Sequence, residues 1–125
     1  MPQTIAIIGA STDRTKFGNV AVRAYRDRGW TVYPVHPALE LVEGLRVYST
    51  IKDVPGPLLR ISLYVPPRSL LRLLADVAAA GADQVWFNPG TDSPAALEEA
   101  RRLGINVVQG CSIVDVGTNP AIYLA

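Results

Sequence analysis

Residues 4–19 read TIAIIGASTDRTKFGN, which is an apolar run, a glycine and a polar loop that lead into a helical pattern. The continuous apolar run at 5–8 is typical of a strand that is covered on both faces, as the strands of parallel sheets are. Apolar side chains then recur at helical spacing over 17–28, and Gly29 follows where the ends of helices favour glycine. This stretch therefore predicts the first strand, the first loop and the first helix of a parallel α/β fold.

The rest of the chain repeats this alternation of strand and helix. Short joints between such elements require right-handed crossovers, which place helices on both faces of a parallel sheet. We therefore expect a single domain over 1–125, of class α/β, with a Rossmann-like doubly wound parallel sheet of about five strands. With 61–65 counted as the third strand, the expected strand order is 3-2-1-4-5. The further strands are predicted at 30–35, 61–65, 84–87 and 105–108, with a short one near 46–48, and the further helices at 68–80 and 94–103.

The composition narrows the class of protein. Hydrophobic residues make up 49% of the chain and charged residues 18%, which excludes an intrinsically disordered chain. The net charge of +1 argues against nucleic acid as a partner. The single cysteine, Cys111, excludes an internal disulfide and a multi-cysteine zinc site, and the scattered acids show no metal-ligand spacing.

The sequence also shows no pattern of a transmembrane segment or of a secretory signal. It has no run of about 20 apolar residues and no recognisable secretory signal at its start. We expect a cytoplasmic protein that binds no membrane, and a protein partner or a homo-oligomer is left open.

Four loops are expected to form the ligand site. In a doubly wound sheet, ligands bind in the crevice outside the carboxyl ends of the strands. The loops that follow predicted strands there are 9–16, 33–37, 64–67 and 87–90. All four should lie on one rim of the domain.

The first of these loops has the chemistry of an anion site. Gly9 permits a sharp turn, Ser11 offers a hydroxyl, and Arg14 and Lys16 bring positive charge to the start of the next helix, whose free amides attract anions. A phosphate or pyrophosphate is the expected guest, although the loop matches neither the GxGxxG nor the GxxxxGK[ST] pattern. The alternative is ordinary turn chemistry, with Arg14 and Lys16 simply solvated.

The other loops lack the acid that usually holds the ribose of NAD, and their apolar residues favour contact with a base and with an apolar part of a ligand. A dinucleotide domain usually places an acid at the end of its second strand, whereas this chain has YPVHP at 33–37. These residues, and the prolines of 64–67, form apolar walls, and Asn88 adds one amide. Prolines after strands are also routine turn residues, so each loop taken alone has that simpler explanation.

Four motifs, in this order, resemble the small stand-alone CoA-binding proteins, which are relatives of the CoA-binding domain of the succinyl-CoA synthetase alpha subunit. The motifs are IGAS…KFGN at 8–19, YPVHP at 33–37, VPP at 65–67 and VWFNPG at 85–90, and the similarity runs from about Thr4 to Asp115. The resemblance implies that coenzyme A binds at this rim, without a reaction of the chain's own. The chain departs from the family pattern at two places. It has His36 where the family often has Asn, and it has Leu59 and Arg60 where the family often has an Asp. The part after Asp115 is not placed by it.

The resemblance also implies which residues meet the ligand. Asn19 belongs to the first motif, and His36 lies on the adenosine shelf, so both are included with the binding residues. The phosphates would meet Gly9, Ala10, Ser11, Arg14 and Lys16; the adenosine would border Pro34, Val35 and Pro37; and the pantetheine would follow Val65, Pro66, Pro67, Asn88, Pro89 and Gly90.

No catalytic set can be assembled from the sequence. The synthetase relatives use a phosphorylated histidine in a second domain, and the only histidine here is His36. We therefore predict non-catalytic binding of coenzyme A or an acyl-CoA, as a carrier, sensor or regulatory module. The alternatives are a binder of another nucleotide such as NAD, or an enzyme of CoA-dependent acyl or disulfide transfer that uses Cys111 or His36.

Overall fold

The computed structural model describes residues 3–124 and contains a five-stranded parallel sheet. The observed order is β2-β1-β5-β6-β7. The fold is therefore Rossmann-like α/β, as expected. The strands are β1 (Thr4–Ile8), β2 (Thr31–Val35), β5 (Arg60–Leu63), β6 (Gln84–Phe87) and β7 (Val107–Gln109).

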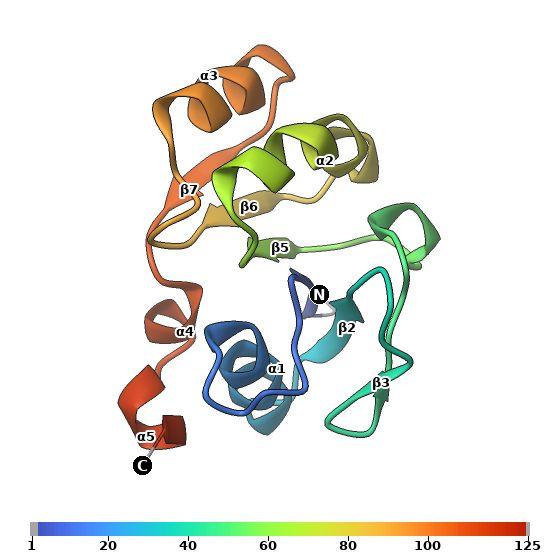
Figure 1. Ribbon diagram of the computed structural model, residues 1–125, viewed down its shortest axis with the longest axis vertical. Coiled ribbons are helices and arrows are strands. Elements are labelled where there is room, and N and C mark those ends of the chain that lie inside the picture. The colour runs from blue at the N-terminus through green and yellow to red at the C-terminus, as the bar shows by residue number, and fades with distance from the viewer. Residues whose placement is uncertain (1–2, 125) are drawn as a thin grey trace.

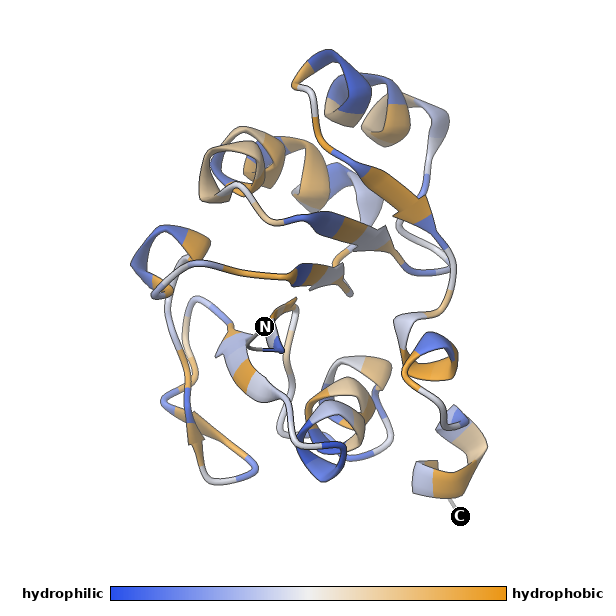
Figure 2. Cartoon of the chain, turned by 180° about the vertical axis from the view of Figure 1, so that it is seen from behind, coloured by the Kyte–Doolittle hydropathy of each residue, from blue (hydrophilic) through white to orange (hydrophobic). Residues whose placement is uncertain are grey.

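Helices cover both faces of the sheet, as predicted. Figure 1 shows α1 (Phe17–Asp27), α4 (Ser112–Asp115) and α5 (Pro120–Leu124) on one side, and α2 (Pro67–Ala80) and α3 (Pro94–Arg102) on the other. The alternation of side chains along β1 explains the two layers. Ile5 and Ile7 are buried against α1, whereas Ala6 and Ile8 are buried against α2 and the rest of the opposite cluster. In Figure 2 the hydrophobic colour follows β7, while outer turns of α3 are hydrophilic.

The strand order differs from the expected one at a single place. The strand counted third, β5, pairs with β1 rather than with β2, so that the order in the same count is 2-1-3-4-5. The free edge of β2 is instead occupied by the segment that follows it. Tyr48 N donates to Pro34 O at 2.9 Å, and His36 N donates to Tyr48 O at 3.0 Å.

The segment between β2 and β5 contains a small hairpin of its own. It holds a two-stranded hairpin of β3 (Leu41–Val42) and β4 (Leu45–Arg46), and then the 3-10 turn η1 (Ile51–Asp53). The chain then returns to the sheet beside β1. The switch point of the sheet therefore lies between the carboxyl ends of β1 and β5, where this fold class places its ligands.

The described residues after Asp115, which the sequence did not place, end in α5, and this helix packs on α1. Tyr123 O accepts from Arg23 Nη1 at 3.3 Å, and Tyr123 OH donates to Asp27 Oδ2 at 2.9 Å. Among residues 3–124, no helix has the length and apolar character needed to cross a membrane.

Candidate functional site

The turn after β1 packs closely against the end of β2, the residue after β5 and the first turn of α1. Gly9 has φ of +91°, and the amides of Gly9 and Ala10 both donate to Val35 O, at 3.1 and 3.3 Å. A Cβ atom on Gly9 would come within 2.7 Å of Tyr64 O. A Cβ atom on Gly18, in the first turn of α1, would overlap the carbonyl oxygen of Gly9. Glycine at both positions lets β1, β5 and α1 meet at this corner.

Two adjoining pockets open at this corner. The main pocket has a volume of about 580 Å³ and the side pocket about 280 Å³, which together fall in the usual range for small-molecule sites. They share Gly9, Ser11, Lys16, Tyr64 and Val65. The main pocket is also lined by Ile8, Ala10, Val35, His36, Pro37, Ser49, Thr50, Ile51, Ser69, Arg72 and Leu73, and the side pocket by Phe17, Gly18, Pro66, Pro89, Gly90 and Thr91.

The four loops predicted to form one rim all contribute to these pockets. Of the residues predicted to bind the ligand, eleven line one or both pockets. Those eleven are Gly9, Ala10, Ser11, Lys16, Val35, His36, Pro37, Val65, Pro66, Pro89 and Gly90. The other five, Arg14, Asn19, Pro34, Pro67 and Asn88, line neither pocket.

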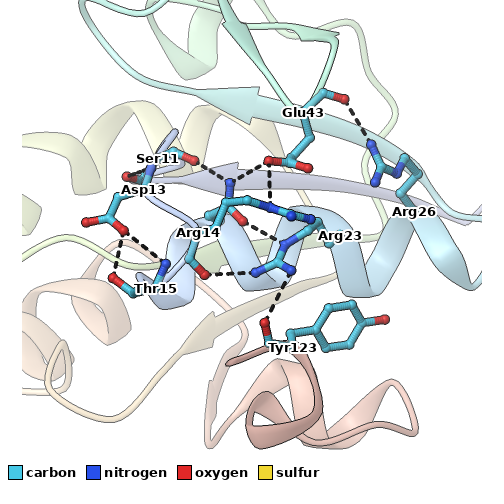
Figure 3. Close-up of polar contacts among 9 residues, drawn as sticks. Ser11, Asp13, Arg14, Thr15, Arg23, Arg26, Glu43 and Tyr123 are labelled. Atoms are coloured by element: carbon cyan, nitrogen blue, oxygen red, sulfur yellow. Dashed lines mark hydrogen bonds and ion pairs between the residues drawn. The ribbon is translucent and has the colours of Figure 1, made fainter. Parts of the chain in front are cut away.

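Arg14 is engaged outside the pockets. Its side chain is 64% exposed, and its Nε lies 3.5 Å from Glu43 Oε2. Glu43 stands in the turn of the β3–β4 hairpin with φ of +50°, and its carbonyl oxygen accepts from Arg26 Nη1 at 2.9 Å. Figure 3 shows Arg14 and Glu43 pointing toward one another above α1.

Asn19 and Arg23 hold the backbone of the anion loop from below. Asn19 Nδ2 donates to Ser11 O at 2.9 Å and to Glu43 Oε2 at 3.1 Å. Arg23, which is 6% exposed, donates from Nε to Asn19 Oδ1 and from Nη2 to Arg14 O, both at 2.8 Å (Figure 3). These part-buried bonds to the carbonyl groups of Ser11 and Arg14 preorganise the loop.

Short-range bonds complete the shape of the loop. Asp13 Oδ1 accepts from Thr15 N at 3.0 Å and from Thr15 Oγ1 at 2.6 Å, and these bonds lower the pKa of Asp13. Ser11 Oγ accepts from Asp13 N at 3.0 Å, so its own proton is available to a ligand.

Lys16 supplies the charge at the junction of the two pockets. It is exposed, it occupies the N-cap of α1, and no side chain caps that helix end. Within residues 3–124, Lys16 takes part in no ion pair. A free ammonium beside an uncapped helix start favours an anion at this junction.

Asn88 is a buried structural residue in this fold. It is 2% exposed, and its Nδ2 donates to Ser62 Oγ at 2.8 Å and to Leu63 O at 2.9 Å. Its Oδ1 accepts from Ser112 N at 2.9 Å, and Ser112 Oγ in turn bonds Tyr64 OH at 3.1 Å. Burial raises the pKa of Tyr64. Asn88 therefore joins β5, β6 and α4 beneath the side pocket.

Several pocket residues were not predicted. Ser49, Thr50 and Ile51 come from the irregular segment before η1, which carried no periodic signal. Ser69, Arg72 and Leu73 come from α2. The sequence indicated only that Arg72 lies off the apolar stripe of the predicted helix at 68–80, and not that it lines a pocket.

The residues considered for catalysis are not brought together. His36 lines the main pocket, and its Nδ1 accepts from Ala38 N at 3.0 Å, which leaves Nε2 for a ligand. Cys111 is half-buried at the start of α4 and lines neither pocket. Among the described residues, no group of three His, Cys, Asp or Glu could hold a metal ion.

Pockets at the switch point of a doubly wound sheet are typical of domains that bind small molecules. The chain matches the model of the CoA binding domain family over residues 3–117. It therefore belongs to this family of CoA-binding domains, which confirms the resemblance carried by the four motifs.

Individual relatives agree with this assignment. The alpha subunit of the ADP-forming acetate–CoA ligase II of Pyrococcus furiosus is 32% identical over 85 residues, which are 67% of this chain but 19% of that subunit. A conserved hypothetical protein of Pyrococcus furiosus has a similar structure, with a TM-score of 0.83 and 29% identity over 90% of this chain and 98% of that chain. The dinucleotide-forming acetyl-coenzyme A synthetase 1 of Ca. Korarchaeum cryptofilum, in complex with phosphate and ADP, gives a TM-score of 0.74 and 26% identity, and the match covers 86% of this chain and 25% of that one.

Proposed function

We propose that this chain binds coenzyme A or an acyl-CoA across the main and side pockets, without catalysing a reaction itself. The observation that carries the proposal is the continuity of the two pockets through Gly9, Ser11 and Lys16. Among the described residues, no Asp or Glu lines either pocket, so the junction suits a diphosphate. A ligand with a diphosphate in its middle and an arm on each side fits this plan.

Each arm of the ligand has a wall of matching chemistry. In this proposal the adenosine lies in the main pocket against Val35 and Pro37, and the pantetheine follows Pro66 and Pro89 in the side pocket. Apolar walls with a few convergent polar groups are the usual lining of small-molecule sites. The family assignment supports coenzyme A as the ligand that combines these parts.

The placement of the reactive side chains supports the proposal of a binding role without chemistry. Cys111 lines neither pocket, and among the described residues the His36 side chain makes no hydrogen bond to a hydroxyl or a thiol. The ligase activity of the Pyrococcus furiosus relative belongs to a subunit of which this chain matches 19%. We therefore propose a carrier, sensor or regulatory module, and the cytoplasmic location remains a prediction.

Ranking of ligands by thermal shift tests this proposal against the binding of another nucleotide. Coenzyme A at 100 times its Kd is expected to stabilise the fold by about 2.7 kcal/mol. NAD should stabilise it less, because no acid in the main pocket is available to hold the ribose hydroxyls. A larger shift with NAD than with coenzyme A would reverse the assignment.

Replacement of Lys16 by alanine is expected to raise the Kd for coenzyme A by about 10- to 100-fold, which is the usual effect of losing a charge-assisted bond to phosphate. Arg14→Ala should have a smaller effect, because Arg14 is paired with Glu43 and lines neither pocket. Isothermal titration calorimetry of both variants measures the difference. Pantetheine, which lacks the nucleotide, is the control ligand, and an equal loss for pantetheine would contradict the phosphate role of Lys16.

A further inference from the structure

The lining of the main pocket includes a second cation, Arg72, which comes from α2 and not from the anion loop. Arg72 lines this pocket together with Ser69 and Leu73, and all three come from one face of α2. Lys16 enters the same pocket from the loop before α1. Since α1 and α2 cover opposite faces of the sheet, the two cations approach the pocket from different layers of the fold.

Arg72 is not neutralised by the acid that its helix offers. Asp76 follows Arg72 by four residues, which is the spacing of a helix ion pair. Asp76 Oδ2 instead lies 4.0 Å from Lys52 Nζ, and within residues 3–124 Arg72 takes part in no ion pair. No acid among these residues lines the main pocket either. Two separate cations that face one cavity without an acid are complementary to a ligand with two separate anionic groups.

We infer that Arg72 and Ser69 form a second anion subsite in the main pocket, which takes a phosphate monoester on the ribose of the ligand. The inference rests on the proposed function, in which the diphosphate lies at Lys16. It narrows the ligand to nucleotides that carry a ribose phosphate in addition to their diphosphate, as coenzyme A does and NAD does not. The planar guanidinium of Arg72 can hold two phosphate oxygens at once, and the Ser69 hydroxyl can donate to a third.

Calorimetric titration with coenzyme A and with 3′-dephospho-CoA tests this subsite, because the two ligands differ only in that phosphate. The wild-type chain should bind coenzyme A about tenfold or more tightly than 3′-dephospho-CoA. Arg72→Ala should weaken coenzyme A to the level of 3′-dephospho-CoA and leave the affinity for 3′-dephospho-CoA unchanged. Arg68→Ala is the matched control, because Arg68 is exposed on the first turn of the same helix and lines neither pocket.

The outcomes separate this inference from the proposed function. Equal affinities of the wild type for the two ligands, or equal losses of both in Arg72→Ala, would overturn the subsite and leave the binding of coenzyme A standing. A wild-type chain that binds neither ligand would overturn the proposed function, and the inference with it. Because Arg72 is exposed, thermal unfolding of Arg72→Ala should match the wild type, so a loss of affinity reports on the ligand.

Discussion

Gly18→Ala is expected to abolish the binding of coenzyme A and to lower the free energy of unfolding by about 3 kcal/mol, at the upper end for overpacked sites. Gly18 is buried, and an added Cβ would overlap the carbonyl oxygen of Gly9, which is backbone and cannot rotate away. The first turn of α1 must then separate from the end of β1, and Lys16 moves with it. Helix propensity alone predicts the opposite result, because alanine is the better helix former and would raise the free energy of unfolding by about 1 kcal/mol.

Gly29→Ala is the matched control for this variant. Gly29 has φ of +82°, which disfavours alanine, but an added Cβ would meet no atom within 4 Å. We expect a cost of about 1 kcal/mol and an unchanged Kd for coenzyme A. Chemical denaturation gives the stability of both variants, and calorimetry gives their affinities. A Gly18→Ala chain with wild-type affinity would refute the tight junction of β1, β5 and α1 as the basis of the site.

Asn88→Ala is expected to lower the free energy of unfolding by about 3 kcal/mol while the folded chain still binds coenzyme A. The substitution leaves the buried Ser112 N–H and Leu63 O without their partner, and each such group costs about 1–3 kcal/mol. Asn88 lines neither pocket, so its removal should not take a contact from the ligand. The measurements are thermal unfolding, and titration well below the unfolding temperature.

Asn106→Ala provides the comparison for Asn88. Asn106 is exposed and makes one side-chain bond, from Nδ2 to Asp83 O at 2.8 Å, so its loss should cost about 1 kcal/mol or less. Loss of affinity in Asn88→Ala at unchanged stability would show instead that Asn88 touches the ligand, as the family resemblance implied.

The regular part of the fold could be predicted from the sequence because each element has a period and an end signal. The apolar run at 5–8 and the helical stripe at 17–28 correspond to β1 and α1 within a residue or two. The strand order could not be predicted, because it depends on the irregular segment that follows β2. That segment bonds through Tyr48 to the free edge of β2, and no periodic signal announces such a contact.

The site was predictable at the level of loops but not of individual side chains. The rule for parallel sheets brought the four loops together, and the glycine of the first loop marked the turn. The direction of a side chain depends on its buried partners. Asn19 turns to Ser11 O and Asn88 turns to Leu63 O, and neither bond is visible in a motif. Arg72 lines the main pocket from α2. The helical pattern of the sequence predicts that its side chain is exposed, but not which pocket it lines.

Titration of coenzyme A into the wild-type chain and into Lys16→Ala shows whether the junction at Gly9, Ser11 and Lys16 holds the diphosphate. We predict saturable heat at one ligand per chain for the wild type, and a Kd raised about 10- to 100-fold for Lys16→Ala. No heat from the wild type at millimolar coenzyme A, or the same Kd for both chains, would contradict diphosphate binding at this junction.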